Sequence, residues 1–190
     1  MLKRIVPFFV GIVATTIVGC TADYLPRPLH STDGALFTAY LPCAPVASQP
    51  PTVDTTTFGR LRAQNYTCKV PLGAVGYVVT IGAFETPTSA KASDDEKQAL
   101  NDAIASKFAS DVCREIVDKD KQMSCVPVRP LHKANASVVD IAFEKSSQRF
   151  LARVHVSSPY IAASMVTEAV TWEDLKLALD VKLPAKLALR

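Results

Sequence analysis

One stretch of this chain has the periodicity of a long amphipathic helix, and strand-like segments lie on both sides of it. After Ser93, apolar side chains recur every fourth residue, and these are Leu100, Ile104, Phe108, Val112 and Ile116, widened by Ala103 and Val117. That spacing places them on one face of an α-helix. Ser93 and Glu96 match a capping box, in which each side chain pairs with the backbone N–H of the other residue. The sequence therefore predicts a helix from about 94 to 118, packed against a core.

Runs rich in β-branched and aromatic residues flank this helix, and they are 35–42, 60–70 and 75–84 before it and 137–143, 149–157 and 160–169 after it. Turn residues between them predict a hairpin before the helix and a three-stranded meander after it. Three prolines between 43 and 57 predict a surface connection there. Thr171 to Asp174 reads as the start of a short C-terminal helix. The expected class is α+β, with an antiparallel sheet flanked by one long helix and a short C-terminal helix.

The N-terminus reads as a secretory signal peptide, because Lys3 and Arg4 precede an uncharged, mostly apolar run from Ile5 to Val18. That run is shorter than the roughly 20 residues that span a bilayer. We therefore expect a signal segment over 1–19, a tether over 20–34 and a single domain over 35–190. The prolines and the glycine of the tether disfavour regular structure. The alternative for the tether is an arm packed along the domain.

The end of the apolar run, Ile17-Val18-Gly19-Cys20, resembles the bacterial lipobox. The resemblance implies cleavage before Cys20, which would receive a diacylglycerol thioether and further acylation, such as palmitate. Several acyl chains anchor a protein stably without a transmembrane helix. Thr21 in place of aspartate implies sorting to the outer membrane, with the domain facing the periplasm. The alternatives are a secreted protein cut nearby, with Cys20 as an odd thiol, and an uncleaved anchor.

Four cysteines remain besides Cys20, and they are Cys43, Cys68, Cys113 and Cys125. An even number in an exported protein predicts disulfides, with three possible connectivities. Local organisation favours Cys43–Cys68 and Cys113–Cys125, since the second pair closes a short loop just after the helix. Zinc is not expected, because the short paired spacing of thiolate ligands is absent.

The C-terminal segment "RFLARVHVSSPYIAASMVTEAVTWEDLKLALDVKL", 149–183, resembles bacterial PsbP/Mog1-like domains. In that family, an aliphatic meander precedes a short C-terminal helix. The resemblance implies an α/β/α sandwich around an antiparallel sheet. It also implies a binding or assembly role without catalysis.

The sequence contains no nucleophile elbow, phosphate loop, H-E-x-x-H or C-x-x-C motif. The histidines are scattered; His30 lies in the expected tether, His132 in a loop and His155 on a strand. Trp172 reads as a core plug or, alternatively, as a partner anchor. Without Lys3 and Arg4, 19 of the 21 basic residues remain against 18 acidic ones, which does not suggest nucleic-acid binding.

We therefore expect no enzyme, cofactor or metal, but a lipid-anchored binding or assembly module with a protein partner in the cell envelope. The alternative is a small-ligand carrier or a small periplasmic enzyme. Its site would use polar residues that belong to no recognised motif, such as His155 and Asp140, with Ser157 on a neighbouring element.

Overall fold

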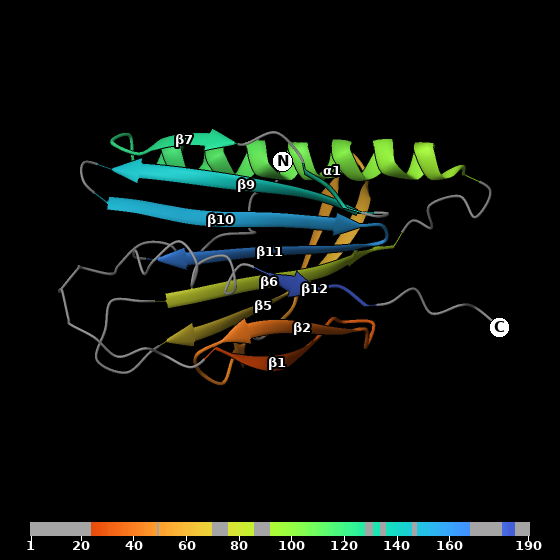
Figure 1. Cartoon of the computed structure of the whole chain (residues 1–190), viewed down its shortest axis with the longest axis horizontal. Helices are drawn as coiled ribbons and strands as arrows, with labels where there is room; N and C mark the ends of the chain where they lie inside the picture. Colours follow the sequence, from red (N-terminus) through yellow and green to blue (C-terminus); the bar gives the residue numbers. More distant parts are fainter. Residues whose placement is uncertain are drawn as a thin grey trace.

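The computed structural model has three layers, in which one helix, a large sheet and a small sheet are stacked (Figure 1). The structure describes residues 24–48, 50–69, 76–85, 92–127, 131–133, 136–145, 148–167 and 180–184. Cys20, Trp172 and the predicted C-terminal helix lie outside these residues. Within the described part, no helix combines the length and the apolar character that crossing a membrane requires. The α+β class is confirmed.

The predicted helix is α1, which runs from Asp94 to Lys119. The capping box is present, because Ser93 Oγ accepts from the Glu96 N–H while the Glu96 carboxylate accepts from the Ser93 N–H. Ile104, Phe108 and Ile116 are buried as expected. The prediction that Ala103 widens the buried stripe is wrong, because Ala103 is exposed. Ala105 and Ala109 are buried instead, since the helix turns its other flank toward the sheet.

The large sheet is antiparallel throughout its described strands. Its main path has the order β3-β5-β6-β11-β10-β9-β7, while β4 also pairs with β5 and β8 also pairs with β9. The strands are β3 (Val46–Ala47), β4 (Thr52–Thr56), β5 (Gly59–Lys69), β6 (Gly76–Phe84), β7 (Ser124–Pro127), β8 (Leu131–Lys133), β9 (Ala136–Lys145), β10 (Gln148–Ser157) and β11 (Tyr160–Thr167). The predicted β5–β6 hairpin and the β9–β10–β11 meander are confirmed.

The expected surface connection over 43–57 contains two short strands, so that prediction is corrected. Both β3 and β4 pair with β5 at the margin of the sheet. The prolines Pro45, Pro50 and Pro51 lie outside these two strands. Proline therefore limits the length of the strands without preventing them, as it does at sheet edges.

The small sheet has the order β1-β2-β12 and consists of β1 (Leu25–His30), β2 (Leu36–Leu41) and β12 (Val181–Lys182). The prediction of an irregular tether is therefore wrong for Leu25–His30, and the packed-arm alternative is correct for this segment. Leu29 is fully buried, which ties the segment to the core. β1 tolerates Pro26 and Pro28 because, among the described strands, it is an edge strand that pairs only with β2.

The large sheet buries both of its faces. On one face, Phe108 of α1 packs edge-to-face on Phe84 of β6, with ring centroids 6.2 Å apart. On the other face, Phe37 of β2 packs in the same way on Tyr160, at 5.6 Å. The central strand β6 is apolar on both sides for this reason, with Val79 and Ile81 buried as well as Phe84.

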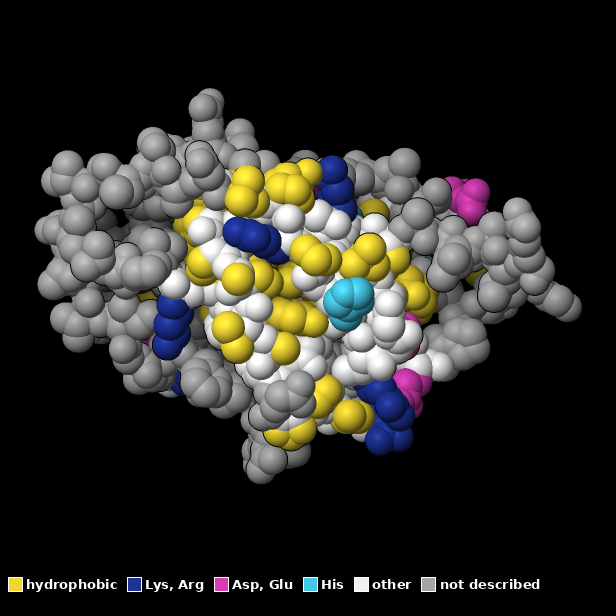
Figure 2. Space-filling model, turned by 90° about the horizontal axis from the view of Figure 1, so that it is seen from below, with side chains coloured by type: hydrophobic (Ala, Val, Ile, Leu, Met, Phe, Trp, Pro, Cys, Tyr) yellow, Lys and Arg dark blue, Asp and Glu magenta, His cyan; other side chains and the backbone are white. Residues whose placement is uncertain are grey.

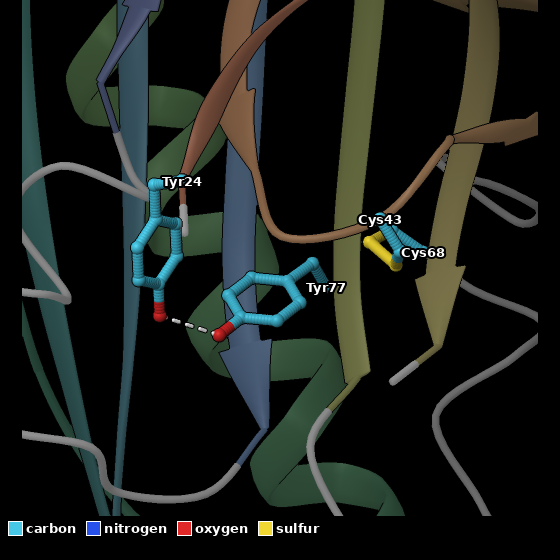
Figure 3. The surroundings of a disulfide bond; sticks show 4 residues. All are labelled: Tyr24, Cys43, Cys68 and Tyr77. Carbon is cyan, nitrogen blue, oxygen red and sulfur yellow. Dashed lines mark hydrogen bonds between the residues drawn. A yellow bond between two sulfur atoms is a disulfide. The ribbon is translucent and has the colours of Figure 1, made fainter. Parts of the chain in front are cut away.

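Two disulfides are present, and their pairing is the predicted one. Cys43 is bonded to Cys68 and Cys113 to Cys125, with Cα atoms 5.7 and 5.6 Å apart. The first bridge does not join neighbouring strands of one sheet, because β2 belongs to the small sheet and β5 to the large one. Cys43 follows β2 and Cys68 lies on β5, so this bond ties the two sheets together (Figure 3).

Candidate functional site

A polar cluster lies on the face of the large sheet that the small sheet covers. Asp140 of β9 and Arg153 of β10 are direct partners in the antiparallel register, so their side chains point to the same side. Arg153 Nε lies 2.7 Å from Asp140 Oδ1, and Arg153 Nη2 lies 3.0 Å from Oδ2. Arg153 Nη1 also lies 3.7 Å from Oδ1 of Asp180, which directly precedes β12. We call these three residues the Asp140–Arg153–Asp180 cluster.

The cluster contains a mostly buried guanidinium that stays charged. The Arg153 side chain is only 13% exposed, whereas Asp140 is 31% exposed. The hydrogen bond with Asp140 raises the pKa of Arg153, and this effect outweighs the opposing effect of burial. The bidentate fork occupies both oxygens of Asp140 with charge-assisted hydrogen bonds. This arrangement holds the carboxylate as a fixed acceptor for the guanidinium.

His155 lies two residues beyond Arg153 on the same face of β10. Its Nδ1 lies 3.1 Å from the backbone carbonyl oxygen of Val181. Because a carbonyl oxygen can only accept, Nδ1 carries the proton in this contact. Val181 is 2% exposed and pairs with Ala39 of β2. His155 and Arg153 therefore both hold the segment that brings β12 onto the small sheet.

The structure places Asp140, His155 and Ser157 on one face but does not bring them together as a triad. In the register, Asp140 lies opposite residue 153, while His155 and Ser157 follow at alternate positions. Each such step along a strand is about 7 Å. A triad requires direct hydrogen bonds between successive members. In the structure the Asp140 carboxylate instead binds Arg153, and Nδ1 of His155 instead lies on the Val181 carbonyl oxygen.

Among the other predicted positions, His30 is not part of this cluster. His30 lies exposed on β1, in the separate small sheet. His132 lies in β8, and its side chain, like Cys20 and Trp172, is not among the described parts. Arg153 and Asp180 were not predicted as site residues. The sequence pattern that could have identified Arg153 is a charged residue that alternates with the apolar positions of β10.

A second acidic position is found near the margin of the large sheet. Burial raises the pKa of Asp54 on β4, and the charge of Glu115 on α1 adds to this effect. Asp54 Oδ2 is buried and has no hydrogen-bond partner among the described residues. The Glu115 carboxylate pairs with Lys119 at 2.8 Å.

Within the described ranges, no three His, Cys, Asp or Glu side chains converge as a metal site would require. Comparison with known proteins finds no matching family model and no matching curated protein. The fold and the cluster together define the class of this molecule. It is a disulfide-braced α+β domain in which a polar cluster joins the C-terminal segment to the large sheet.

If the Asp140–Arg153–Asp180 cluster is structural, Asp140→Asn should destabilise the domain by about 2 kcal/mol, because a charge-assisted hydrogen bond is lost around a buried guanidinium. Urea unfolding at neutral pH measures this loss. The matched control is Asp118→Asn, which removes an exposed ion pair with Lys121. That control should unfold at the same urea concentration as the wild type. Equal stability of the two variants would contradict the structural role of Asp140.

Proposed function

We propose that this protein is a bacterial lipoprotein of the cell envelope, anchored through Cys20, whose domain acts as a non-catalytic binding or assembly module. The observation that carries this proposal is that the polar side chains best suited to catalysis make contacts within the fold. Asp140 is held by Arg153, and His155 donates to the backbone of Val181. The Asp140 carboxylate is thus engaged within the large sheet, and the His155 ring joins the large sheet to the small one.

The proposed location is the outer membrane, with the domain in the periplasm. The lipobox-like Ile17-Val18-Gly19-Cys20 and the following Thr21 support it. The two disulfides are consistent with it, because disulfides persist in oxidising compartments outside the cytosol.

The PsbP/Mog1-like assignment is also a proposal. It is supported by α1 on one face of an antiparallel sheet and by the β9–β10–β11 meander. In the described part, the small sheet covers the second face of the large sheet where the family predicts helix. The assignment therefore depends on the predicted helix that begins at Thr171, which lies outside the described residues.

The margin formed by β3 and β4 is the surface that best suits a protein partner. Val46 on β3 is 67% exposed and Val53 on β4 is 47% exposed. Among the described strands, β4 pairs only with β5, so its second side carries no strand. An edge strand of this kind can accept an extended segment of a partner through main-chain hydrogen bonds. We propose that the envelope partner docks here.

Affinity purification of the acylated full chain from its native membrane tests the module. One envelope protein should be recovered reproducibly with the wild type and lost with Val53→Asp. Ala103→Asp is the matched control, because Ala103 is also an exposed apolar residue but lies on α1. Recovery that survives Val53→Asp would contradict docking at β4. Recovery of no protein, together with a small molecule retained by the domain, would favour a ligand carrier instead.

A further inference from the structure

The small sheet turns one face to the core and the other face outward. Leu29, Phe37, Ala39 and Val181 fill the inner face and are nearly inaccessible. The strand register places the alternate residues on the opposite face, and these are Pro26, Pro28, His30, Leu36, Thr38, Tyr40 and Lys182. We call this set the outer face of the small sheet. Seen from below the view of Figure 1, this side of the molecule presents hydrophobic side chains beside histidine and basic side chains (Figure 2).

The chemistry of the outer face is that of a lipid–water interface. Leu36 is 53% exposed, although it is a large apolar side chain. The Lys182 ammonium lies over the Tyr40 ring, 5.4 Å from its centroid. None of the seven residues of this face is acidic. Apolar, tyrosyl and basic side chains together are typical of surfaces that lie in the headgroup region of a membrane.

The free edge of β1 offers no N–H group to a partner strand. The His30 N–H donates to Tyr66 Oη at 3.0 Å, and the Tyr66 hydroxyl donates to the His30 carbonyl at 2.7 Å. Alternate residues of a strand point the same way, so positions 26 and 28 also turn their backbone away from β2. Both are prolines, which have no N–H. This edge therefore disfavours strand addition by a protein. It can also lie against a low-polarity surface without placing an unpaired N–H group there.

The chain connection places this sheet close to the proposed anchor. Tyr24 is held to the domain, because its Oη lies 2.6 Å from Tyr77 Oη (Figure 3). The chain from Cys20 to Tyr24 covers at most about 15 Å even when fully extended. That distance is about half the thickness of the hydrocarbon core of a bilayer. A lipid on Cys20 would therefore keep the start of β1 at the membrane surface.

We infer that the outer face of the small sheet lies on the lipid bilayer, with Leu36 and the two prolines among the headgroups and Lys182 toward anionic lipid. The inference rests on the proposed acylation of Cys20. It gives the domain a defined orientation, because the short chain from Cys20 to Tyr24 and the apolar outer face both hold the small sheet at the membrane. The opposite layer, α1, then faces away from the membrane.

Fluorescence quenching in vesicles tests this orientation with the acylated full chain. The single tryptophan is first removed by Trp172→Phe. A reporter is then introduced by Leu36→Trp, and the matched control is Val46→Trp, since Val46 is also exposed but shares its face with Thr67 on the helix side of β5. The vesicles contain phosphatidylcholine with bromine on its acyl chains and a minor share of phosphatidylglycerol. His30→Trp provides a second reporter on the outer face.

An apolar face inserts about 5–10 Å into the headgroup and acyl boundary, so the reporters at positions 36 and 30 should lose roughly half of their fluorescence. The control at position 46 should keep its fluorescence. Quenching at position 46 equal to that at 36 would overturn the orientation. An acylated protein without quenching at positions 36 and 30 would also overturn the orientation, while the anchor itself stands. A mass spectrum without acyl chains would refute the anchor and this inference together.

Discussion

Cys20→Ala should move the protein from the membrane fraction to the soluble fraction and abolish its labelling with palmitate. The thiol is the only group at this position that can form the thioether, and alanine removes it. Each buried CH₂ of an acyl chain contributes about 0.8 kcal/mol to membrane binding, so the loss of the chains removes essentially all of the anchoring. The described part of the chain contains no helix that could replace the anchor by spanning the membrane.

Fractionation should be done at high salt, because salt screens the attraction of Lys182 and other basic side chains to anionic lipid. Thr21→Ser is the matched control, since it changes the neighbouring residue and keeps the thiol. This control should remain in the membrane pellet and retain the label. A Cys20→Ala variant that still sediments with membranes at high salt would show that the anchor lies elsewhere.

Removal of the Cys43–Cys68 bridge should lower the free energy of unfolding by about 3.5 kcal/mol, as chain entropy predicts for this loop length. The two cysteines are 25 residues apart in sequence. The bond links the segment after β2 to β5, so its loss also frees the small sheet from the large one. The change is made with Cys43→Ala and Cys68→Ala together, which leaves no unpaired thiol. Urea unfolding measures the loss.

The matched control is the double variant Cys113→Ala and Cys125→Ala, whose cysteines are 12 residues apart. The shorter loop predicts a loss of about 3 kcal/mol, which is close to the loss predicted for the first variant. The two variants are therefore distinguished by the part of the fold that loses protection. Amide hydrogen exchange should lose protection in β1 and β2 for the first variant, and at the end of α1 and in β7 for the second. Unchanged protection of β1 and β2 in the first variant would show that packing alone holds the small sheet.

Elements specified by local signals could be predicted from the sequence. The capping box at Ser93 and Glu96 and the apolar stripe of α1 both lie within one segment, and the helix begins where they indicate. The β5–β6 hairpin and the meander join strands that are adjacent in sequence. The disulfide pairing was also predictable, since each bond joins cysteines that are near in sequence.

Strands that contain or adjoin prolines could not be predicted, although β1 pairs with the next strand along the chain and so does β4. Leu25–His30 contains two prolines and looks irregular by itself, yet it forms β1 because β2 satisfies one side of its backbone. In the same way, Val46–Ala47 and Thr52–Thr56 form strands because β5 extends along them. The orientation of α1 about its axis was likewise decided by the sheet, which is why Ala105 is buried in place of Ala103.

The sequence by itself determined the α+β class, the cysteine pairs and the residue types that could serve a site, because local spacing and composition specify them. It named Asp140 and His155 but could not assign their roles. Only the tertiary structure decided those roles, since the β9–β10 register sets Arg153 against Asp140 and the docking of β12 brings Val181 to His155. Contacts between residues far apart in sequence follow from strand register and layer packing, and a one-residue shift in register would turn each of these side chains to the other face.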